Sequence, residues 1–221
     1  MSLRPAYQNI VSRPLRPIGG VRKRTFDILF SIFGLLAFAP IFVMVIIAQK
    51  LFTKGPIFFS HQRIGAGGQT FGCLKFRTMV VDAEDRLEAL LEADPIAKAE
   101  FERDCKLKND PRIIPIVGSF LRKSSLDEIP QFLNVLMGDM TIVGPRPVTE
   151  RELNLYGNSK NIYTSIRPGI TGLWQVSGRN DTSFEERVAF DRIYISTWSI
   201  LQDLRIILRT VVVMVNRDGA Y

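Results

Sequence analysis

Two adjacent carboxylates, Asp127 and Glu128, are the residues whose types and spacing most directly suggest chemistry. They stand in the stretch KSSLDEIPQF, just before a proline and a hydrophobic segment. A carboxylate at the start of a helix feels the positive end of the helix dipole, which favours its ionised form. It can then act as a nucleophile or as a ligand of a hard cation such as Mg²⁺. The pair is therefore a candidate reaction centre.

The same residues also fit a purely structural use. Ser125, followed three positions later by Glu128, matches a capping box, in which both side chains satisfy exposed backbone donors. Pro130 weakens this interpretation, because with Ser125 as the cap it would stand too far inside the helix for its missing N–H to be harmless. If Pro130 opens the helix instead, both carboxylates precede the helix start. The sequence leaves both alternatives open.

Arginines accompany the carboxylates in glycine- and proline-rich segments. Arg122 lies shortly upstream of the pair, and two loops, GDMTIVGPRPV and RPGITGLWQVSGRND, carry Arg146, Arg167 and Arg179. The planar guanidinium group matches phosphate oxygens in pairs. If the loops converge on the carboxylates, the site suits a diphosphate. The alternative is that each arginine caps a turn.

An apolar segment must hold these residues near a membrane. Ile28 to Ala48 are 21 residues without a charge, and a helix of that length is about 30 Å long, enough to cross a bilayer. Pro40 predicts a kink near the middle. A cleaved signal peptide fits poorly because the apolar run is too long. A buried core helix is a further alternative.

The charge distribution bears on how this segment meets the membrane. Residues 1–54 hold eight basic residues against one acid, so the whole net charge of +7 belongs to this quarter of the chain. The basic residues flank the apolar run on both sides, which favours both ends on the cytoplasmic side and a segment that dips in and returns. A single pass remains the alternative. No nucleic-acid recognition motif accompanies the charge, and the two cysteines indicate neither a metal site nor a disulfide framework.

The remaining segments predict surface structure around the site. Residues 55–79 indicate two short strands around a glycine turn at 65–68. Residues 82–110 indicate two charged surface helices interrupted at Asp94-Pro95. Residues 198–216 predict an amphipathic helix. Its apolar stripe either packs on the core or lies in the membrane interface.

Several long motifs in one order resemble a known family. The segments that carry the resemblance are KRTFDILF, GPIFFSHQRIGAGGQTFGCLKFRTM, LRKSSLDEIPQFLNVLMGDMTIVGPRP, RPGITGLWQVSGRN and FDRIYISTWSILQDLRIILRT. With these motifs the chain, from Arg22 to the C-terminus, resembles the bacterial sugar transferases, the monotopic polyprenyl-phosphate phosphoglycosyl transferases. The acidic helical insert at 82–110 and the ending NRDGAY look most like members that start exopolysaccharide repeat units with galactose 1-phosphate.

The resemblance implies a mostly helical α+β fold. A basic arm (1–20) precedes a re-entrant membrane helix hairpin (21–54), and a small cytosolic α/β catalytic domain with amphipathic interface helices follows (55–221). The family's membrane hairpin bends at a Ser-Pro pair, whereas this chain has Ala39-Pro40 at that point. A serine hydroxyl assists bending by bonding a carbonyl in the preceding turn. The sharpness of the bend is therefore open.

The resemblance also implies a reaction. Asp127 would attack the β-phosphorus of a UDP-sugar and release UMP, and undecaprenyl phosphate would then accept the hexose 1-phosphate, with galactose favoured over glucose. Glu128 would hold Mg²⁺ or orient Asp127, and two further acids that match family positions, Asp191 and Asp203, are candidate metal or supporting ligands. The candidate phosphate contacts are Lys75, Arg77, Arg122, Arg146, Arg167 and Arg179.

The location and partners of the protein can also be predicted, together with two alternative functions. The enzyme would sit in the inner membrane with its catalytic domain facing the cytoplasm, in contact with lipids and without nucleic acid. Pairing of two copies through the membrane segment or the helices at 82–110 is open. A non-catalytic membrane-surface scaffold would explain the charge but not the carboxylate pair beside arginine-bearing loops. A lipid-embedded hydrolase would use similar residues and differ in transferring to water.

Overall fold

The computed structural model describes residues 18–104, 107–178 and 182–215. Contacts divide these residues into two compact units, which are described separately. The first unit comprises described residues within 18–30, 62–71 and 135–215, and the second comprises those within 31–61 and 72–134. Four elements, α2, β1, β2 and α6, contribute residues to both units.

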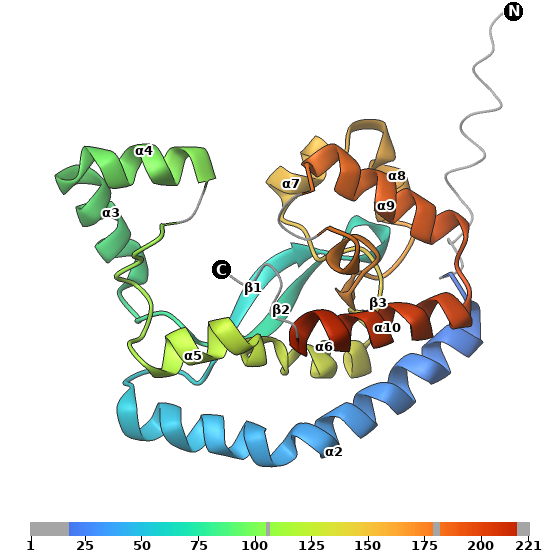
Figure 1. Cartoon of the computed structure of the whole chain (residues 1–221), viewed down its shortest axis with the longest axis horizontal. Coiled ribbons are helices and arrows are strands. Elements are labelled where there is room, and N and C mark those ends of the chain that lie inside the picture. The colour runs from blue at the N-terminus through green and yellow to red at the C-terminus, as the bar shows by residue number, and fades with distance from the viewer. Residues whose placement is uncertain (1–17, 105–106, 179–181, 216–221) are drawn as a thin grey trace, which may run out of the picture. The chain divides into compact units, whose positions relative to one another are not determined.

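The apolar segment forms one helix, α2 (Gly20–Phe52), of 33 residues with Pro40 inside it (Figure 1). By length and composition alone it could cross a membrane. The expected helix hairpin is not what the structure shows, because residues on both sides of Pro40 belong to the same helix. Two physical reasons account for this difference. Ala39 supplies no hydroxyl to help a bend, and the Pro40 ring lies on the exposed face.

The second unit is built on the end of α2 and a hairpin of two strands. The strands β1 (Phe58–Ile64) and β2 (Thr70–Phe76) pair in a two-stranded sheet. They flank the short helix η1 (Ala66–Gly68), where two glycines adopt the positive φ that the predicted turn requires. The expectation of two strands around a glycine turn is confirmed. The core of this unit brings together Val45 of α2, Phe76 of β2, and Leu121 and Ile129.

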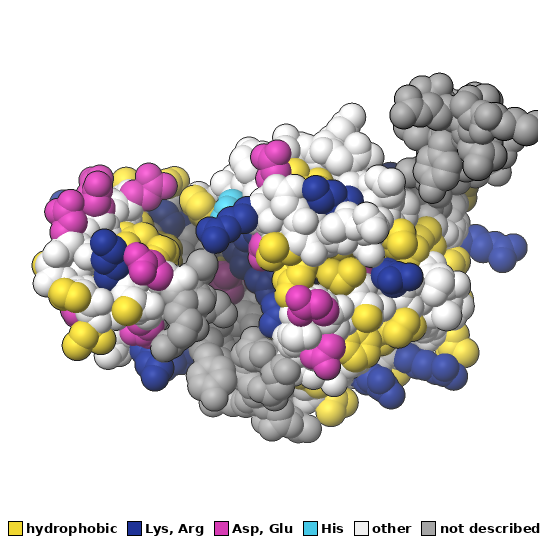
Figure 2. Space-filling view, turned by 90° about the horizontal axis from the view of Figure 1, so that it is seen from above, with side chains coloured by type: hydrophobic (Ala, Val, Ile, Leu, Met, Phe, Trp, Pro, Cys, Tyr) yellow, Lys and Arg dark blue, Asp and Glu magenta, His cyan; other side chains and the backbone are white. Residues whose placement is uncertain are grey.

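Two charged helices extend the second unit, as the sequence predicts. Helix α3 (Ala83–Ala93) ends before Asp94, and α4 (Pro95–Asp104) begins with a proline at its first position, where the missing N–H is harmless. The Asp94 carboxylate accepts hydrogen bonds from the first free N–H groups of α4, those of Ile96 and Ala97. Figure 2 shows acidic side chains gathered over α3 and α4.

The remaining helices of the second unit lead to the carboxylate pair. Helix α5 (Val117–Ser124) is followed by the short helix η2 (Leu126–Glu128) and then by α6 (Gln131–Met137). Leu121 of α5 and Ile129 are both almost fully buried in the core of this unit. The turn that bears the carboxylates is therefore held between two buried anchor points.

The first unit has its own small sheet and its own core. Strands β3 (Thr141–Val143) and β4 (Gly169–Thr171) are parallel, with Thr141 opposite Gly169 and Val143 opposite Thr171. The core contains Ile64, Val148, Tyr156 and Tyr163. The helices around it are α7 (Glu150–Leu155), η3 (Gly157–Ser159), α8 (Lys160–Tyr163), η4 (Trp174–Val176), α9 (Phe184–Ser196) and α10 (Ile200–Val215).

Helix α10 confirms the predicted amphipathic helix and bears on the first of its two alternatives, packing on the core. The residues that it buries are Asp203 and Ile206. Most of the predicted apolar stripe is exposed, including Leu201, Leu208 and Val215, which are 53%, 67% and 73% accessible. The stripe therefore does not pack on the core of its unit, and it remains available for a membrane interface.

Candidate active site

The carboxylate pair lies in the short helix η2, one turn before α6. Ser125 adopts a left-handed conformation with φ of 57° and makes no side-chain capping bond, so the capping box is absent. Helix α6 begins at Gln131, directly after Pro130. The alternative in which Pro130 marks the helix start and both carboxylates precede it is therefore confirmed. Capping does not account for the presence of Asp127 and Glu128.

Lys75 of β2 reaches both carboxylates. Its Nζ atom lies 2.7 Å from Oε1 of Glu128 and 3.6 Å from Oδ2 of Asp127. The Asp127 side chain is 12% accessible and that of Glu128 is 32% accessible. The shared ammonium group offsets part of the repulsion between two adjacent acids. Asp127 is the more buried of the two carboxylates and lies farther from the ammonium group.

Electrostatics set the proton affinity of Asp127. Burial raises the pKa of this carboxyl group above its ordinary value. Lys75 and Arg122 act in the opposite direction and lower the pKa, whereas the neighbouring Glu128 raises it. The helix start was expected to favour the ionised form of Asp127. The cost of burial is instead the largest influence on its pKa, and it favours the protonated form. A raised pKa makes the ionised form a stronger nucleophile.

Arg77 is engaged mainly with the protein. Its guanidinium group donates to the carbonyls of Pro56, Met79 and Lys54 and to the Thr53 hydroxyl, all next to the end of α2 or of β2. Burial lowers the pKa of this group. These bonds leave little donor capacity for a phosphate. Arg77 instead joins the C-terminal end of the apolar helix to the strand that carries Lys75.

The remaining predicted phosphate contacts are divided between the two units. Arg122 belongs to the second unit and is exposed, near enough to Asp127 to lower its pKa. Arg146 is exposed and Arg167 is half-buried, both in the first unit, and Nε of Arg167 donates to the Gly138 carbonyl. Arg179 lies outside the described residues. Convergence of these arginines on the carboxylates stays a prediction.

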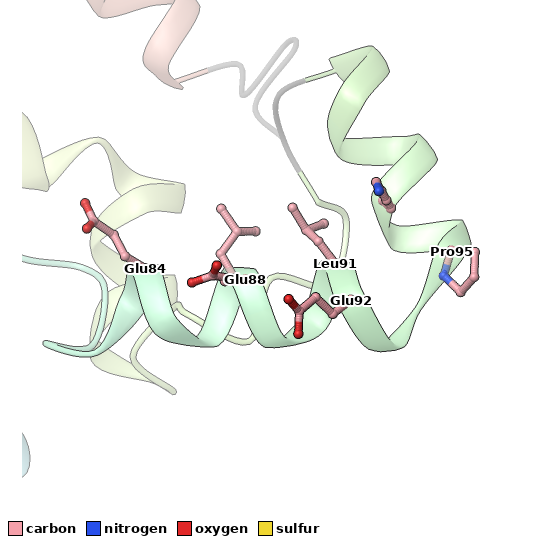
Figure 3. A pocket seen from close by; sticks show the side chains of 7 residues that line it. Glu84, Glu88, Leu91, Glu92 and Pro95 are labelled. Atoms are coloured by element: carbon pink, nitrogen blue, oxygen red, sulfur yellow. The ribbon is translucent and has the colours of Figure 1, made fainter.

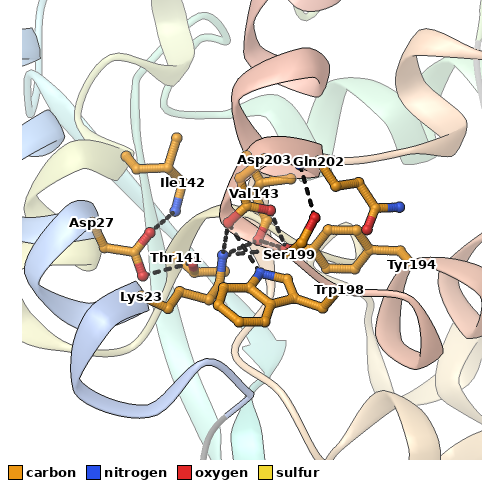
Figure 4. Close-up of polar contacts among 10 residues, drawn as sticks. All are labelled: Lys23, Asp27, Thr141, Ile142, Val143, Tyr194, Trp198, Ser199, Gln202 and Asp203. Atoms are coloured by element: carbon orange, nitrogen blue, oxygen red, sulfur yellow. Dashed lines mark hydrogen bonds and ion pairs between the residues drawn. The ribbon is translucent and has the colours of Figure 1, made fainter.

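Asp203, a candidate metal ligand, is fully buried in a polar cluster of the first unit (Figure 4). Its Oδ2 lies 2.7 Å from Nζ of Lys23 and accepts from the Trp198 indole, while Oδ1 accepts from the Tyr194 hydroxyl. Three protein donors therefore occupy both oxygens. The sequence indicates Lys23 only as part of a basic flank. Lys23 stands one helical turn before Asp27, inside the predicted helix, and this spacing could have distinguished it from the other basic residues of the flank.

Asp191, the other added candidate, is also buried. Its Oδ2 accepts a hydrogen bond of 2.7 Å from the Tyr156 hydroxyl. Burial raises the pKa of Asp191 to about 7. Across 18–104, 107–178 and 182–215, no three acidic, histidine or cysteine side chains form a group that could hold a metal. A metal role for Asp191 and Asp203 stays a prediction that these contacts do not support.

A surface groove is found elsewhere in the second unit. It has a volume of about 630 Å³ and lies against α3 and α4 (Figure 3). The side chains that line it are Glu84, Leu87, Glu88, Leu91, Glu92, Pro95 and Lys98. None of the predicted site residues is among them. The volume of the groove therefore does not point to the predicted site residues.

Comparison with known proteins connects this arrangement to a family. The family model for bacterial sugar transferases matches residues 18–217. The chain belongs to the bacterial sugar transferase family. It is 49% identical over 207 residues to the exopolysaccharide production protein ExoY of Sinorhizobium fredii, covering 94% of this chain and 91% of that protein.

Two further bacterial sugar transferases show the range of names among the relatives. The undecaprenyl-phosphate galactose phosphotransferase of Salmonella typhimurium is 50% identical over 200 residues, which cover 90% of this chain and 41% of that protein. A UDP-glucose:undecaprenyl-phosphate glucose-1-phosphate transferase of Caulobacter vibrioides is 37% identical over 233 residues, covering 100% of this chain and 81% of that protein. The chain is thus a sugar-phosphate transferase.

For a sugar transferase of this kind, the donor set around η2 fits Mg²⁺. The ion binds in proteins through one or two carboxylates together with phosphate oxygens of a substrate. Asp127 and Glu128 supply two adjacent carboxylates, which share the single positive charge of Lys75 and so keep a net negative charge between them when both are ionised. These two residues would therefore hold the ion together with a bound diphosphate.

Proposed function

We propose that this sugar transferase moves a hexose 1-phosphate from a UDP-sugar to undecaprenyl phosphate and releases UMP, as the first membrane step of exopolysaccharide synthesis. The observation that carries the proposal is the buried Asp127 carboxylate beside Glu128 and Lys75. We propose galactose 1-phosphate as the group transferred. Two relatives named for galactose are 49% and 50% identical to this chain over nine-tenths of its length, whereas two named for glucose are 37% and 39% identical.

In the first step, an oxygen of Asp127 attacks the β-phosphorus of the UDP-sugar. The bond between this phosphorus and the bridging oxygen breaks, and UMP leaves with that oxygen. The sugar phosphate is then attached to Asp127 as an acyl phosphate. Asp127 suits this role better than Glu128, because it is more buried and lies 3.6 Å from the Lys75 ammonium, against 2.7 Å for Glu128. A less hydrated and less tightly paired carboxylate is the better nucleophile.

In the second step, an oxygen of undecaprenyl phosphate attacks the same phosphorus. The bond to Asp127 breaks, which restores the carboxylate and gives the polyprenyl diphosphate sugar. The two-step route lets a water-soluble donor and a lipid acceptor use one site in turn. Lys75 and Arg122 lower the negative potential that both anionic substrates meet. Asp127 and Glu128 would hold Mg²⁺, which when bound would supply further charge neutralisation on the transferring phosphate.

We further propose that α2 lies in one leaflet with both ends on the cytoplasmic side. Near its N-terminus, Lys23 forms a buried ion pair with Asp203 of the first unit. Near its C-terminus, the buried Gln49 donates to the Arg77 carbonyl of the second unit. Basic residues flank the apolar run on both sides, which supports this orientation. The outward residues between the two anchors, such as Phe33, Leu36 and Met44, are exposed and apolar.

A trapping experiment tests the proposed reaction. Purified protein in lipid is incubated with UDP-galactose labelled in the sugar, without lipid acceptor, and analysed by mass spectrometry for a hexose phosphate on the peptide that contains Asp127. Asp127→Asn should abolish the adduct and turnover. Asp85→Asn, which changes an exposed carboxylate of the same unit, is the matched control and should retain both. Normal turnover by Asp127→Asn would remove this residue from its role.

A panel of donors separates the remaining alternatives. UMP release is measured with UDP-galactose and UDP-glucose, each with and without undecaprenyl phosphate. Faster release with UDP-galactose supports the proposed sugar, and preference for UDP-glucose would replace it. Sugar phosphate released to water at the same rate without the lipid would indicate a hydrolase. Absence of UMP release with any donor would favour a scaffold.

A further inference from the structure

Asn134 is a fully buried amide that the reaction described above does not use. It lies on α6 and is 0% accessible. Its Nδ2 donates to the Gly72 carbonyl at 2.8 Å, and its Oδ1 accepts from the Leu74 N–H at 2.9 Å. Both partners belong to β2. One carboxamide therefore pairs with this strand through a donor and an acceptor, as the peptide group of a neighbouring strand would.

The two hydrogen bonds from Asn134 to β2, here called the clamp, lie next to Lys75 in the strand. Leu74 immediately precedes Lys75, whose ammonium group contacts both carboxylates. On the other side of Lys75, Gln49 donates to the Arg77 carbonyl. Buried side-chain amides thus hold the backbone of β2 before the lysine and that of Arg77, just past the end of β2, after it. A lysine side chain is long and flexible, so its ammonium is placed well only if its backbone is fixed.

The clamp also joins the two halves of the site. Helix α6, which carries Asn134, begins at Gln131, three residues after Glu128. A bond from α6 to β2 is therefore a bond from the carboxylate segment to the lysine strand. Loss of this bond would let the strand and the η2–α6 segment separate. A displacement of about 1 Å at a reaction centre can cost about 10²-fold in rate.

We propose that Asn134 is a positioning residue that fixes Lys75 against Asp127 and Glu128. The inference rests on the proposed function for its kinetic consequence, but the geometry that it asserts does not depend on turnover. A purely structural Asn134 would lower the thermal stability when removed and leave the environment of Lys75 unchanged. A positioning Asn134 would in addition loosen the contact of Lys75 with the carboxylates. The two roles differ in this second effect.

The first measurement follows Lys75 directly. The full-length protein in lipid is treated with formaldehyde and cyanoborohydride, and the methylation of Lys75 is followed by mass spectrometry relative to Lys98, an exposed lysine of the same unit. Asn134→Ala should raise the relative methylation rate of Lys75 severalfold. Thr210→Val is the control, because it removes a hydroxyl that bonds Thr171 and Ile206 in the first unit. It should lower the melting temperature without changing Lys75.

The second measurement uses the pH dependence of turnover. Lys75 lowers the pKa of Asp127, so a displaced Lys75 should move the acid limb of kcat/KM to higher pH. Asn134→Leu provides a second variant if the alanine variant does not fold. It has a similar shape and removes both the donor to Gly72 and the acceptor for Leu74 without adding a charge. It should give changes of the same direction.

The outcomes test the positioning role of Asn134 separately from the proposed transfer reaction. Faster Lys75 methylation in the Asn134 variants supports positioning even if the wild-type protein releases no UMP. Lower melting temperatures, with Lys75 methylation and the acid limb both unchanged, would overturn the positioning role. The same result from Thr210→Val as from Asn134→Ala would also overturn it, because general loosening would then account for both.

Discussion

Each of the two units contains a lysine paired with carboxylate groups. The two groups differ in solvent accessibility and in how fully protein donors satisfy the carboxylate oxygens. In the first unit, Lys23 and Asp203 are 4% and 0% accessible, and Tyr194 and Trp198 satisfy the rest of the carboxylate. In the second unit, Lys75 is 28% accessible and is shared between Asp127 and Glu128. A saturated, closed pair holds a fold together. A partly open cluster with excess negative charge can accept a cation and a phosphate.

The closed pair should give the largest effect on stability. Lys23→Met leaves Asp203 buried without its cation, and breaking a buried pair on one side costs about 3–5 kcal/mol. We expect a lower melting temperature and poor recovery from membranes. The double variant Lys23→Met with Asp203→Leu removes both charges and should be more stable than the single variant. Equal stability of Lys23→Met and wild type would show that the pair does not anchor α2.

The open cluster should instead give its effect on activity. Lys75→Met removes the cation shared by the two carboxylates, and loss of one group that stabilises developing charge costs about 10²–10³ in kcat. The free energy of unfolding should change by about 1 kcal/mol or less, because the lysine is partly exposed. Thermal unfolding and UMP release measure the two effects on the same sample. A loss of stability as large as that of Lys23→Met would erase the distinction between the pairs.

The sequence predicted the local elements well and the tertiary pairings poorly. Glycines with positive φ marked the hairpin turn, and Asp94-Pro95 marked a helix boundary, because these signals are local. The ion pair of Lys23 with Asp203 joins residues 180 positions apart, and no spacing rule connects them. The same limit explains Arg77, whose partners are backbone carbonyls that no sequence pattern reveals.

The candidate site was predictable in its chemistry and only partly in its geometry. An acidic pair before a proline indicated Asp127 and Glu128. Lys75 was expected to contact phosphate, and its pairing with both carboxylates was not foreseen. Burial of Asp127 reversed the expected direction of its pKa, because desolvation depends on tertiary contacts that the sequence does not specify. Asp191 and Asp203 both match acidic positions of the family motifs, but a match of this kind does not distinguish a metal ligand from a buried hydrogen-bond acceptor. Their partners in the fold make that distinction.

Asp191 offers a third carboxylate for comparison, buried in the first unit and hydrogen-bonded to the Tyr156 hydroxyl. Its folded pKa of about 7 lies above the unfolded value of 3.8. Between these values the unfolded state binds fewer protons, so the stability falls as the pH rises. Asp191→Asn should therefore exceed wild type in stability at pH 8 and lose this advantage toward pH 4. The gain from pH 5 to pH 8 should be about 2–3 kcal/mol.

Thermal unfolding across this pH range, in the absence of metal and substrate, measures the difference. Tyr156→Phe is the matched control, because it removes the hydroxyl that donates to Asp191 while keeping the carboxylate. It should extend the fall in stability to higher pH, since the hydrogen bond favours the ionised form and its loss raises the folded pKa further. A pH-independent difference between Asp191→Asn and wild type would contradict a raised pKa.

The smallest expected effect concerns Arg122, the more distant of the two cations that influence Asp127. Arg122 lowers the pKa of Asp127, but less than Lys75 does, and it is exposed, so water and salt screen its charge. At low salt, Arg122→Gln should move the acid limb of kcat/KM to higher pH, by less than Lys75→Met does. The shift should shrink as salt is added, whereas that of Lys75→Met should persist, because Lys75 lies against the carboxylates. If the shift in Arg122→Gln does not depend on salt, Arg122 contacts the bound phosphate directly. In that case the variant should raise KM for the UDP-sugar more than it lowers kcat.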